Sequence, residues 1–230
     1  MADGEDAGRL PSAALVSYRS CVSPERIAEL LAPFLAGAEL APEPLAQIAR
    51  YMELLLRWNQ RLNLTAVRDQ ESIVTRHFGE SLFAARLLAP RPDEAVLDFG
   101  SGAGFPGLPL AIASPQARVT LLEAQQKKAT FLREVVRALA LENVVVFARR
   151  GEEFTGRAAL VTLRAVERFA TSLTTAAGLV EPGADGRLAL LIGAAQVPEA
   201  QALVPALKWE TPVPVPLSTA RVLLVGQNQR

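Results

Sequence analysis

The chain has 230 residues, half of them hydrophobic and 21% charged, which is the composition of an ordinary globular protein with one α/β domain and an extra segment. Its formal net charge is zero, so no global field attracts a membrane or a nucleic acid, and an RNA partner requires a local basic patch. Cys21 is the one cysteine and the chain has one histidine, which excludes a disulfide within the chain and a cysteine or histidine metal cluster, and favours a reducing cytoplasm.

The N-terminal 22 residues are small and polar, and we expect a disordered tail there. They are acidic and lack the apolar segment of a signal peptide. No run of about 18 apolar residues occurs in the sequence, so we expect no membrane span.

Residues 23–92 read as an N-terminal helical extension. Ser23 before Pro24 is a helix start, and this first helix runs to about residue 35. A long amphipathic helix follows from about residue 42 to 62. Asp69 can cap a third helix, which the prolines after residue 89 end.

From residue 93 to 230, predicted strands alternate with helices. This alternation indicates an α/β domain with a mostly parallel sheet covered by helices on both faces, and we expect it to pack with the extension as one globular unit. The proline-rich piece at 211–216 suits an edge or a connection. The predicted strands are 95–98, 119–122, 144–147, 160–163, 187–192 and 221–225, with helices at 127–139 and 171–179.

The first strand leads into the loop Asp98-Phe-Gly-Ser-Gly-Ala-Gly-Phe-Pro-Gly107, and a helix is expected to open behind it. Its glycines at 100, 102 and 104 allow positive φ and a close approach of a ligand to the backbone. Asp98 followed by three alternating glycines is typical of methyltransferases that use S-adenosylmethionine. The last three glycines also fit the dinucleotide fingerprint, so NAD stays open at this point.

Acidic residues end the next two strands. Glu123 closes the second strand, where a carboxylate accepts hydrogen bonds from the ribose hydroxyls of an adenosine cofactor. Glu152 follows the third strand, where the adenine edge is expected. Asp98 beside the charged amino-acid end of the cofactor, and the lack of a histidine after the loop to assist hydride transfer, favour S-adenosylmethionine over NAD.

The helical extension carries many polar groups for helices with an apolar face. Trp58, His77 and the nearby arginines suggest a ledge that stacks a base and holds phosphates. A simpler interpretation also stays open, in which Asn63 and Thr65 end a helix, Arg76 and Glu80 form an i,i+4 ion pair, and His77 only packs.

These motifs together resemble the RsmG family, also called GidB, of 16S ribosomal RNA guanine-N7 methyltransferases. The resemblance covers roughly residues 43–226 and rests on Trp58-Asn59, Asn63 to Asp69, Arg76-His77, the glycine loop, Leu121 to Glu123, Lys128 with Phe131-Leu132, and Arg150 to Phe154. It implies a Rossmann-like methyltransferase sheet with S-adenosylmethionine as cofactor. The implied substrate is a guanine in the 530 loop of 16S rRNA in the small ribosomal subunit, methylated at N7 by a cytoplasmic enzyme that we expect to be a monomer.

The resemblance and the motifs assign roles to individual residues. We expect Arg164 and His77 to be catalytic, with Arg164 orienting both the cofactor and the base. The expected cofactor-binding residues are Asp98, Gly100, Gly102, Gly104, Phe105, Glu123, Gly151, Glu152 and Arg164. The expected substrate-binding residues are Asn63, Arg68, Arg76, His77 and Arg221.

The chain departs from the family pattern at three places. Ile192 stands where the family usually has lysine, Gly226-Gln227 replaces C-terminal lysines, and Glu80 replaces an aspartate. The missing lysines remove expected phosphate contacts, for which Arg149, Arg150 and Arg221 are candidate replacements. A diverged relative that binds cofactor or RNA without catalysis is therefore an alternative, and an NAD-dependent oxidoreductase is another.

Overall fold

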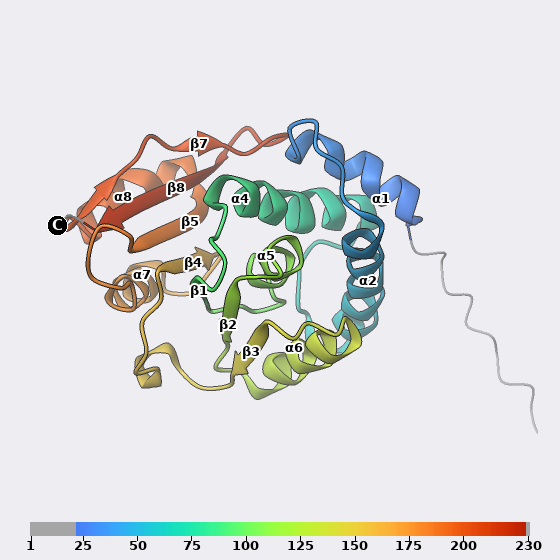
Figure 1. The fold of residues 1–230 in the computed structure, drawn as a ribbon, viewed down its shortest axis with the longest axis horizontal. Coiled ribbons are helices and arrows are strands. Elements are labelled where there is room, and N and C mark those ends of the chain that lie inside the picture. The colour runs from blue at the N-terminus through green and yellow to red at the C-terminus, as the bar shows by residue number, and fades with distance from the viewer. Residues whose placement is uncertain (1–21, 229–230) are drawn as a thin grey trace, which may run out of the picture.

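The computed structural model describes residues 22–228 and shows one sheet flanked by helices (Figure 1). The predicted tail, with Cys21 in it, lies outside the described residues apart from Val22. The sheet has eight strands in the order β3-β2-β1-β4-β5-β8-β6, with β7 paired to β8. The strands are β1 Ala95–Phe99, β2 Arg118–Leu122, β3 Val144–Phe147, β4 Leu160–Arg164, β5 Arg187–Gly193, β6 Leu207–Trp209, β7 Val213–Pro214 and β8 Arg221–Asn228.

Strands β1 to β5 are parallel, and β8 runs antiparallel to β5. Because β8 is reversed, its first residue, Arg221, pairs with Gly193 at the carboxyl end of β5. The order of the strands changes direction at β1, because β2 and β3 lie on one side of it and β4 and β5 on the other. Open α/β sheets bind their ligands in a crevice at such a point. The carboxyl ends of the five parallel strands and the start of β8 therefore lie at one edge of the sheet.

Alternate strand residues face two separate apolar cores. Val96 and Leu191 belong to one core and Leu97 and Leu190 to the other, as the two-residue period of a strand requires. The first core is covered by the helical extension with α5 (Gly107–Ala113) and α6 (Gln126–Ala138), and the second by α7 (Phe169–Gly178) and α8 (Val197–Leu203). The predicted α/β class with helices on both faces is confirmed.

The helical extension shares its core with the sheet. It consists of α1 Pro24–Leu31, α2 Pro42–Leu62, α3 Gln70–Ile73, a π-helix η2 Val74–Gly79, and α4 Glu80–Leu88. Tyr51 and Phe78 are completely buried in the same cluster as Phe131 of α6. The boundary predicted near residue 92 falls between α4 and β1, and its status as a domain boundary stays a prediction. None of the helices within residues 22–228 has both the length and the apolar character to cross a bilayer.

Most predicted elements are present with ends shifted by one or two residues. Ser23 caps α1 by accepting from the Arg26 amide at 3.2 Å, and Asp69 caps α3 through the Ser72 amide at 2.7 Å. The third predicted helix differs, because a π-helix interrupts it at residues 74–79. Helix α8 and strand β6 were not predicted, since both are short and lie in a stretch without clear periodicity.

Gly79 lets the π-helix approach the short 3-10 turn η1 (Ala32–Phe34). A Cβ at this position meets ring atoms of Phe34 at 2.5–2.8 Å, and Phe34 is buried. We expect Gly79→Ala to lower the free energy of unfolding by about 1–3 kcal/mol through overpacking. Gly178→Ala, at an exposed helix position with no atom within 4 Å, is the control and should be neutral or add up to about 1 kcal/mol. Equal effects in chemical denaturation would contradict this account.

Candidate functional site

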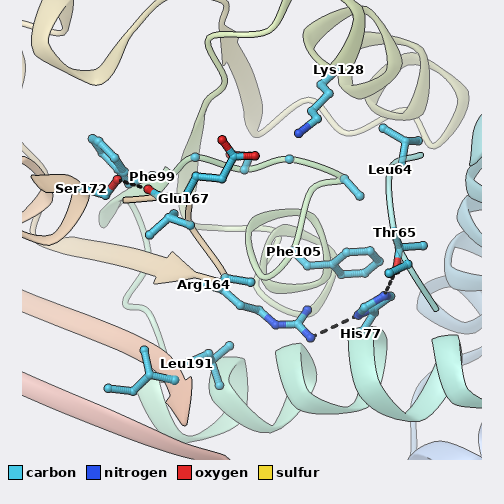
Figure 2. A pocket seen from close by; sticks show the side chains of 18 of the residues that line it. Leu64, Thr65, His77, Phe99, Phe105, Lys128, Arg164, Glu167, Ser172 and Leu191 are labelled. Carbon is cyan, nitrogen blue, oxygen red and sulfur yellow. Dashed lines mark hydrogen bonds between the residues drawn. The ribbon is translucent and has the colours of Figure 1, made fainter. Parts of the chain in front are cut away.

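A cavity of about 620 Å³ opens at the carboxyl edge of the parallel strands (Figure 2). Its walls come from the loop after α2, the π-helix, the glycine loop after β1, the segments that follow β2, β4 and β5, and the start of β8. The volume lies within the range of small-molecule sites, and the position matches the topological crevice. The fold therefore brings together residues from the helical extension and from five strands.

The glycine loop adopts the conformation that its sequence predicts. Gly100, Gly102 and Gly104 have φ of 69°, 58° and 94°, which residues with a side chain rarely adopt. At Gly104 a Cβ would also collide with Leu108 and the Tyr51 hydroxyl. Tyr51 of α2 donates a hydrogen bond to the Ala103 carbonyl, so the helical extension fixes the loop directly.

Glu123 is held in place by the loop that it faces. Its two carboxylate oxygens accept from the Gly102 amide at 2.9 Å and from the Gln125 amide at 2.7 Å. The residue is only 6% exposed, yet it lines the cavity. Each carboxylate oxygen keeps acceptor capacity beyond its one amide partner, so this carboxylate can also accept hydrogen bonds from ligand hydroxyls.

Asp98 lies below the loop rather than on the cavity wall. Its Oδ1 accepts from the Thr162 hydroxyl at 2.8 Å and its Oδ2 from the Gly107 amide at 3.2 Å. The residue is 1% exposed, and burial raises the pKa of its carboxyl to about 6 against the opposing effect of these hydrogen bonds. The structure therefore gives Asp98 a role in building the loop, and contact with a cofactor stays a prediction.

Phe105 sits between aromatic residues of the helical extension. Its ring stacks on Tyr51 at 5.3 Å between centroids and on His77 at 5.0 Å, and Phe78 meets it edge-on at 5.1 Å. Phe105 also lines the cavity, beneath the guanidinium of Arg164. The stack fixes the floor of the cavity between the glycine loop and the π-helix.

Arg164, His77 and Thr65 form a chain of hydrogen bonds across one wall (Figure 2). Arg164 Nη2 lies 3.2 Å from His77 Nδ1, and His77 Nε2 lies 2.6 Å from Thr65 Oγ1. The same Nη2 donates to the Arg76 carbonyl at 2.6 Å. Burial and the neighbouring charges of Arg164 and Arg76 lower the pKa of His77 to about 3, so the imidazole is uncharged at neutral pH.

Glu80 joins the two arginines of this wall. Its carboxylate is buried and pairs with Arg164 at 3.2 Å and with Arg221. Burial raises the pKa of Glu80 and the two arginines oppose that shift. The predicted ion pair between Arg76 and Glu80 is not among the salt bridges of residues 22–228, because the π-helix bonds each residue to the fifth along and disturbs the four-residue spacing that the pair requires.

The cavity collects eight of the predicted site residues: His77, Arg76, Gly100, Gly102, Phe105, Glu123, Arg164 and Arg221. Asn63 and Arg68 bond each other at 2.9 Å on the exposed surface beside the lining residues 64–67. Gly151 packs against Phe99, which lines the cavity, and Glu152, the next residue in the chain, is exposed. Gly104 supports the loop from the side of Tyr51. The functional roles of all these residues stay predictions.

Several residues that line the cavity or support its walls were missed in the sequence. Thr65 was interpreted as part of a helix end. Lys128 was seen only as a family motif, although its place in the first turn of the helix after β2 is a usable signal. Tyr51 gave no signal, because its position on an apolar helix face hides the role of its hydroxyl. Glu80 was paired with the wrong partner.

The departures from the family pattern have different positions. Ile192 lines the cavity at the end of β5, where the family usually has lysine. Gln227 pairs with Arg187 at the amino end of β5, which is the opposite edge of the sheet. Of the two places where lysines are missing, only Ile192 therefore lies at the cavity, and the third departure, Glu80, pairs with two arginines of its wall.

Comparisons with known proteins agree with this geometry. The family model described as rRNA small subunit methyltransferase G matches residues 44–213. A protein of Halorhodospira halophila named Ribosomal RNA small subunit methyltransferase G is 43% identical over 169 residues, which cover 70% of this chain and 78% of that protein. A protein of the same name from Exiguobacterium is 42% identical over 139 residues, 58% of each chain, so that alignment spans little more than half of the relative.

Solved structures show the same fold at low sequence identity. Magnesium protoporphyrin IX methyltransferase from Synechocystis, solved with bound S-adenosylmethionine, has a TM-score of 0.60 and 14% identity, over 78% of this chain and 97% of that one. The fold is therefore that of Rossmann-like S-adenosylmethionine-dependent methyltransferases.

The lowered pKa of His77 gives a prediction for stability against pH. Below about pH 6.5 the unfolded chain takes up a proton on this imidazole while the folded chain does not, so acid destabilises the fold. We expect the wild type to lose roughly 2–3 kcal/mol relative to His77→Gln between pH 7.5 and 4.5, measured by denaturant unfolding. Asp98 titrates in both proteins, so its contribution cancels in the difference between their free energies of unfolding. A difference that is constant with pH would show that His77 has an ordinary pKa.

Proposed function

The chain belongs to the family of ribosomal RNA small subunit methyltransferase G, and we propose that it transfers a methyl group from S-adenosylmethionine to N7 of a guanine in the 530 loop of 16S rRNA. One observation carries the proposal. A single cavity has Glu123 and the glycine loop on one side and Thr65, His77 and Arg164 on the other. Such a cavity has room for an adenosine cofactor and for a base brought beside it.

The residues on the first side fit S-adenosylmethionine. Glu123 is fixed by two amides and can accept from ribose hydroxyls, and Gly102 leaves open space where a ligand can approach the backbone. S-adenosylmethionine supplies an electrophilic methyl group on a sulfonium ion. The protein's contribution is to hold this group and the base in line, which is worth on the order of 7–11 kcal/mol.

The residues on the second side fit a nucleophile that can react without a general base. Guanine N7 carries a lone pair and no proton, so its methylation requires no general base, and the uncharged, hydrogen-bonded His77 is consistent with this. Arg164 binds its protein acceptors through Nη2, and its Nε and Nη1 have no acceptor within the described residues. These free donors support a positioning role for Arg164 toward the base or the cofactor.

Basic side chains at the mouth support an RNA partner despite the zero net charge. Arg76 and Arg221 line the cavity, Arg68 lies beside it, and Arg149 and Arg150 are exposed at the same edge after β3. Local clusters of this kind hold phosphates. We also propose that the chain acts on the small ribosomal subunit, in the cytoplasm and as a monomer.

Cofactor choice can be tested by thermal unfolding. We expect S-adenosylmethionine to raise the melting temperature, with about 2.7 kcal/mol of stabilisation at a hundredfold excess over Kd, and NAD to have no effect. Glu123→Ala should weaken the binding, because its carboxylate meets the ribose. Stabilisation by NAD alone would favour the oxidoreductase alternative.

The reaction can be tested by single-turnover methyl transfer to small subunits that lack the modification, with the modified base located by mass spectrometry. We expect Arg164→Ala to slow transfer about 100-fold or more, the usual cost of removing a positioned donor. Arg118→Ala, at the opposite edge of the sheet, is the control for losing an arginine. Cofactor binding without transfer in the wild type would instead favour a non-catalytic relative, for which Ile192 is the supporting observation.

A further inference from the structure

Thr65 is a cavity residue whose hydrogen-bonding direction is determined by its neighbours. It comes from the loop after α2, is 9% exposed and lines the cavity. The chain of contacts that determines this direction begins at Arg164. A guanidinium can only donate hydrogen bonds, so we assign His77 Nδ1, 3.2 Å from Arg164 Nη2, as an acceptor. The two hydrogens of Nη2 are then shared among His77 Nδ1, the Arg76 carbonyl and Glu80.

The tautomer of His77 follows from that contact. A neutral imidazole that accepts at Nδ1 carries its proton on Nε2, and the lowered pKa of His77 keeps it neutral. The Nε2–H group then donates to Thr65 Oγ1 across 2.6 Å. The Val67 amide donates to the same oxygen at 3.1 Å.

These two donors occupy both acceptor positions of the Thr65 hydroxyl. A hydroxyl has two lone pairs and one proton, so Thr65 has only its proton left to offer. Within residues 22–228 no protein acceptor receives that proton. Thr65 is therefore an obligatory donor toward the contents of the cavity, and a ligand there must present an acceptor.

We propose that Thr65 is a specificity-determining residue, whose hydroxyl donates a hydrogen bond to O6 of the target guanine. This inference rests on the proposed function. O6 is an acceptor beside N7 on the same edge of guanine, whereas adenine carries a donor, its N6 amino group, at that place. A hydroxyl that can only donate forms a hydrogen bond with O6 of guanine. It finds no acceptor in the N6 amino group of adenine, so adenine is disfavoured.

The position of Thr65 indicates that its hydrogen-bond partner is the target guanine rather than the cofactor. Thr65 lies on the side of Phe105 that the helical extension supplies, with His77 next to it (Figure 2). Glu123, the expected ribose ligand, follows β2 on the side of the glycine loop. The cofactor's carboxylate is also an acceptor, so the test measures cofactor affinity separately.

The experiment compares methyl transfer to small subunits that carry the natural guanine or an adenine at the target position, under single-turnover conditions with radiolabelled cofactor. Thr65→Val removes the hydroxyl, and Thr65→Ser keeps it. Thr75→Val is the matched control, because the Thr75 hydroxyl donates to the Glu71 carbonyl outside the cavity. Unfolding and cofactor affinity are measured for every variant.

We expect Thr65→Val to lower the guanine-to-adenine rate ratio at least about tenfold, by slowing transfer to guanine without slowing transfer to adenine. Thr65→Ser should recover most of the guanine rate, and Thr75→Val should leave it unchanged. If adenine is unreactive with every variant, a tenfold loss on guanine that serine recovers, with cofactor affinity intact, supports the same conclusion.

Three results would overturn the inference. An equal loss on both bases would give Thr65 a structural role, a comparable loss of cofactor affinity would assign its proton to the cofactor, and wild-type behaviour of Thr65→Val would leave the hydroxyl without a role. Each of these leaves the proposed function standing, provided that the wild type methylates guanine. If the wild type methylates neither base, the proposed function itself fails and this inference with it.

Discussion

The position of Phe105 between Tyr51 and His77 is the contact on which the cavity depends. Phe105 belongs to the glycine loop, whereas both stacking partners belong to the helical extension. The Tyr51 hydroxyl also holds the Ala103 carbonyl of the same loop. Buried aromatic pairs contribute about 0.5–1.5 kcal/mol each beyond their burial, and they fix orientation as well. The extension is therefore part of the site, because it holds the loop and supplies one wall.

The buried charges of that wall are arranged around Glu80. Its carboxylate offsets part of the charge of Arg164 and Arg221, and His77 adds none because its pKa is lowered. A buried charge without a partner is costly, so each member of this cluster depends on the others. In the proposed reaction a positive charge moves from sulfur to the purine, and an uncharged histidine avoids a further cation beside the base.

Sequence reasoning predicted what local patterns determine. Strand ends, helix caps and the positive φ angles of the glycine loop follow from residues close in the chain, so the position of Glu123 at the sheet edge was predictable. Partner choice was not, because Glu80 bonds Arg164 across 84 residues and the π-helix disturbs the local spacing with Arg76. Thr65 acquires its role only through His77 and Arg164, which no local pattern contains.

Asp98 explains why the loop matched two cofactor patterns at once. Its carboxylate receives the Gly107 amide, the first of α5, where a negative charge stabilises a helix start, and it also ties β1 to β4 through Thr162. A Cβ at position 107 would meet Asp98 Oδ2 at 2.7 Å and Leu121 at 2.5 Å, so the last glycine serves the packing of the helix on the strands. Neither residue needs to touch a ligand to be required there. The acidic residue that faces the cavity is instead Glu123. NAD and S-adenosylmethionine both carry an adenosine ribose, so this carboxylate can serve either cofactor, and neither acidic residue separates the two patterns.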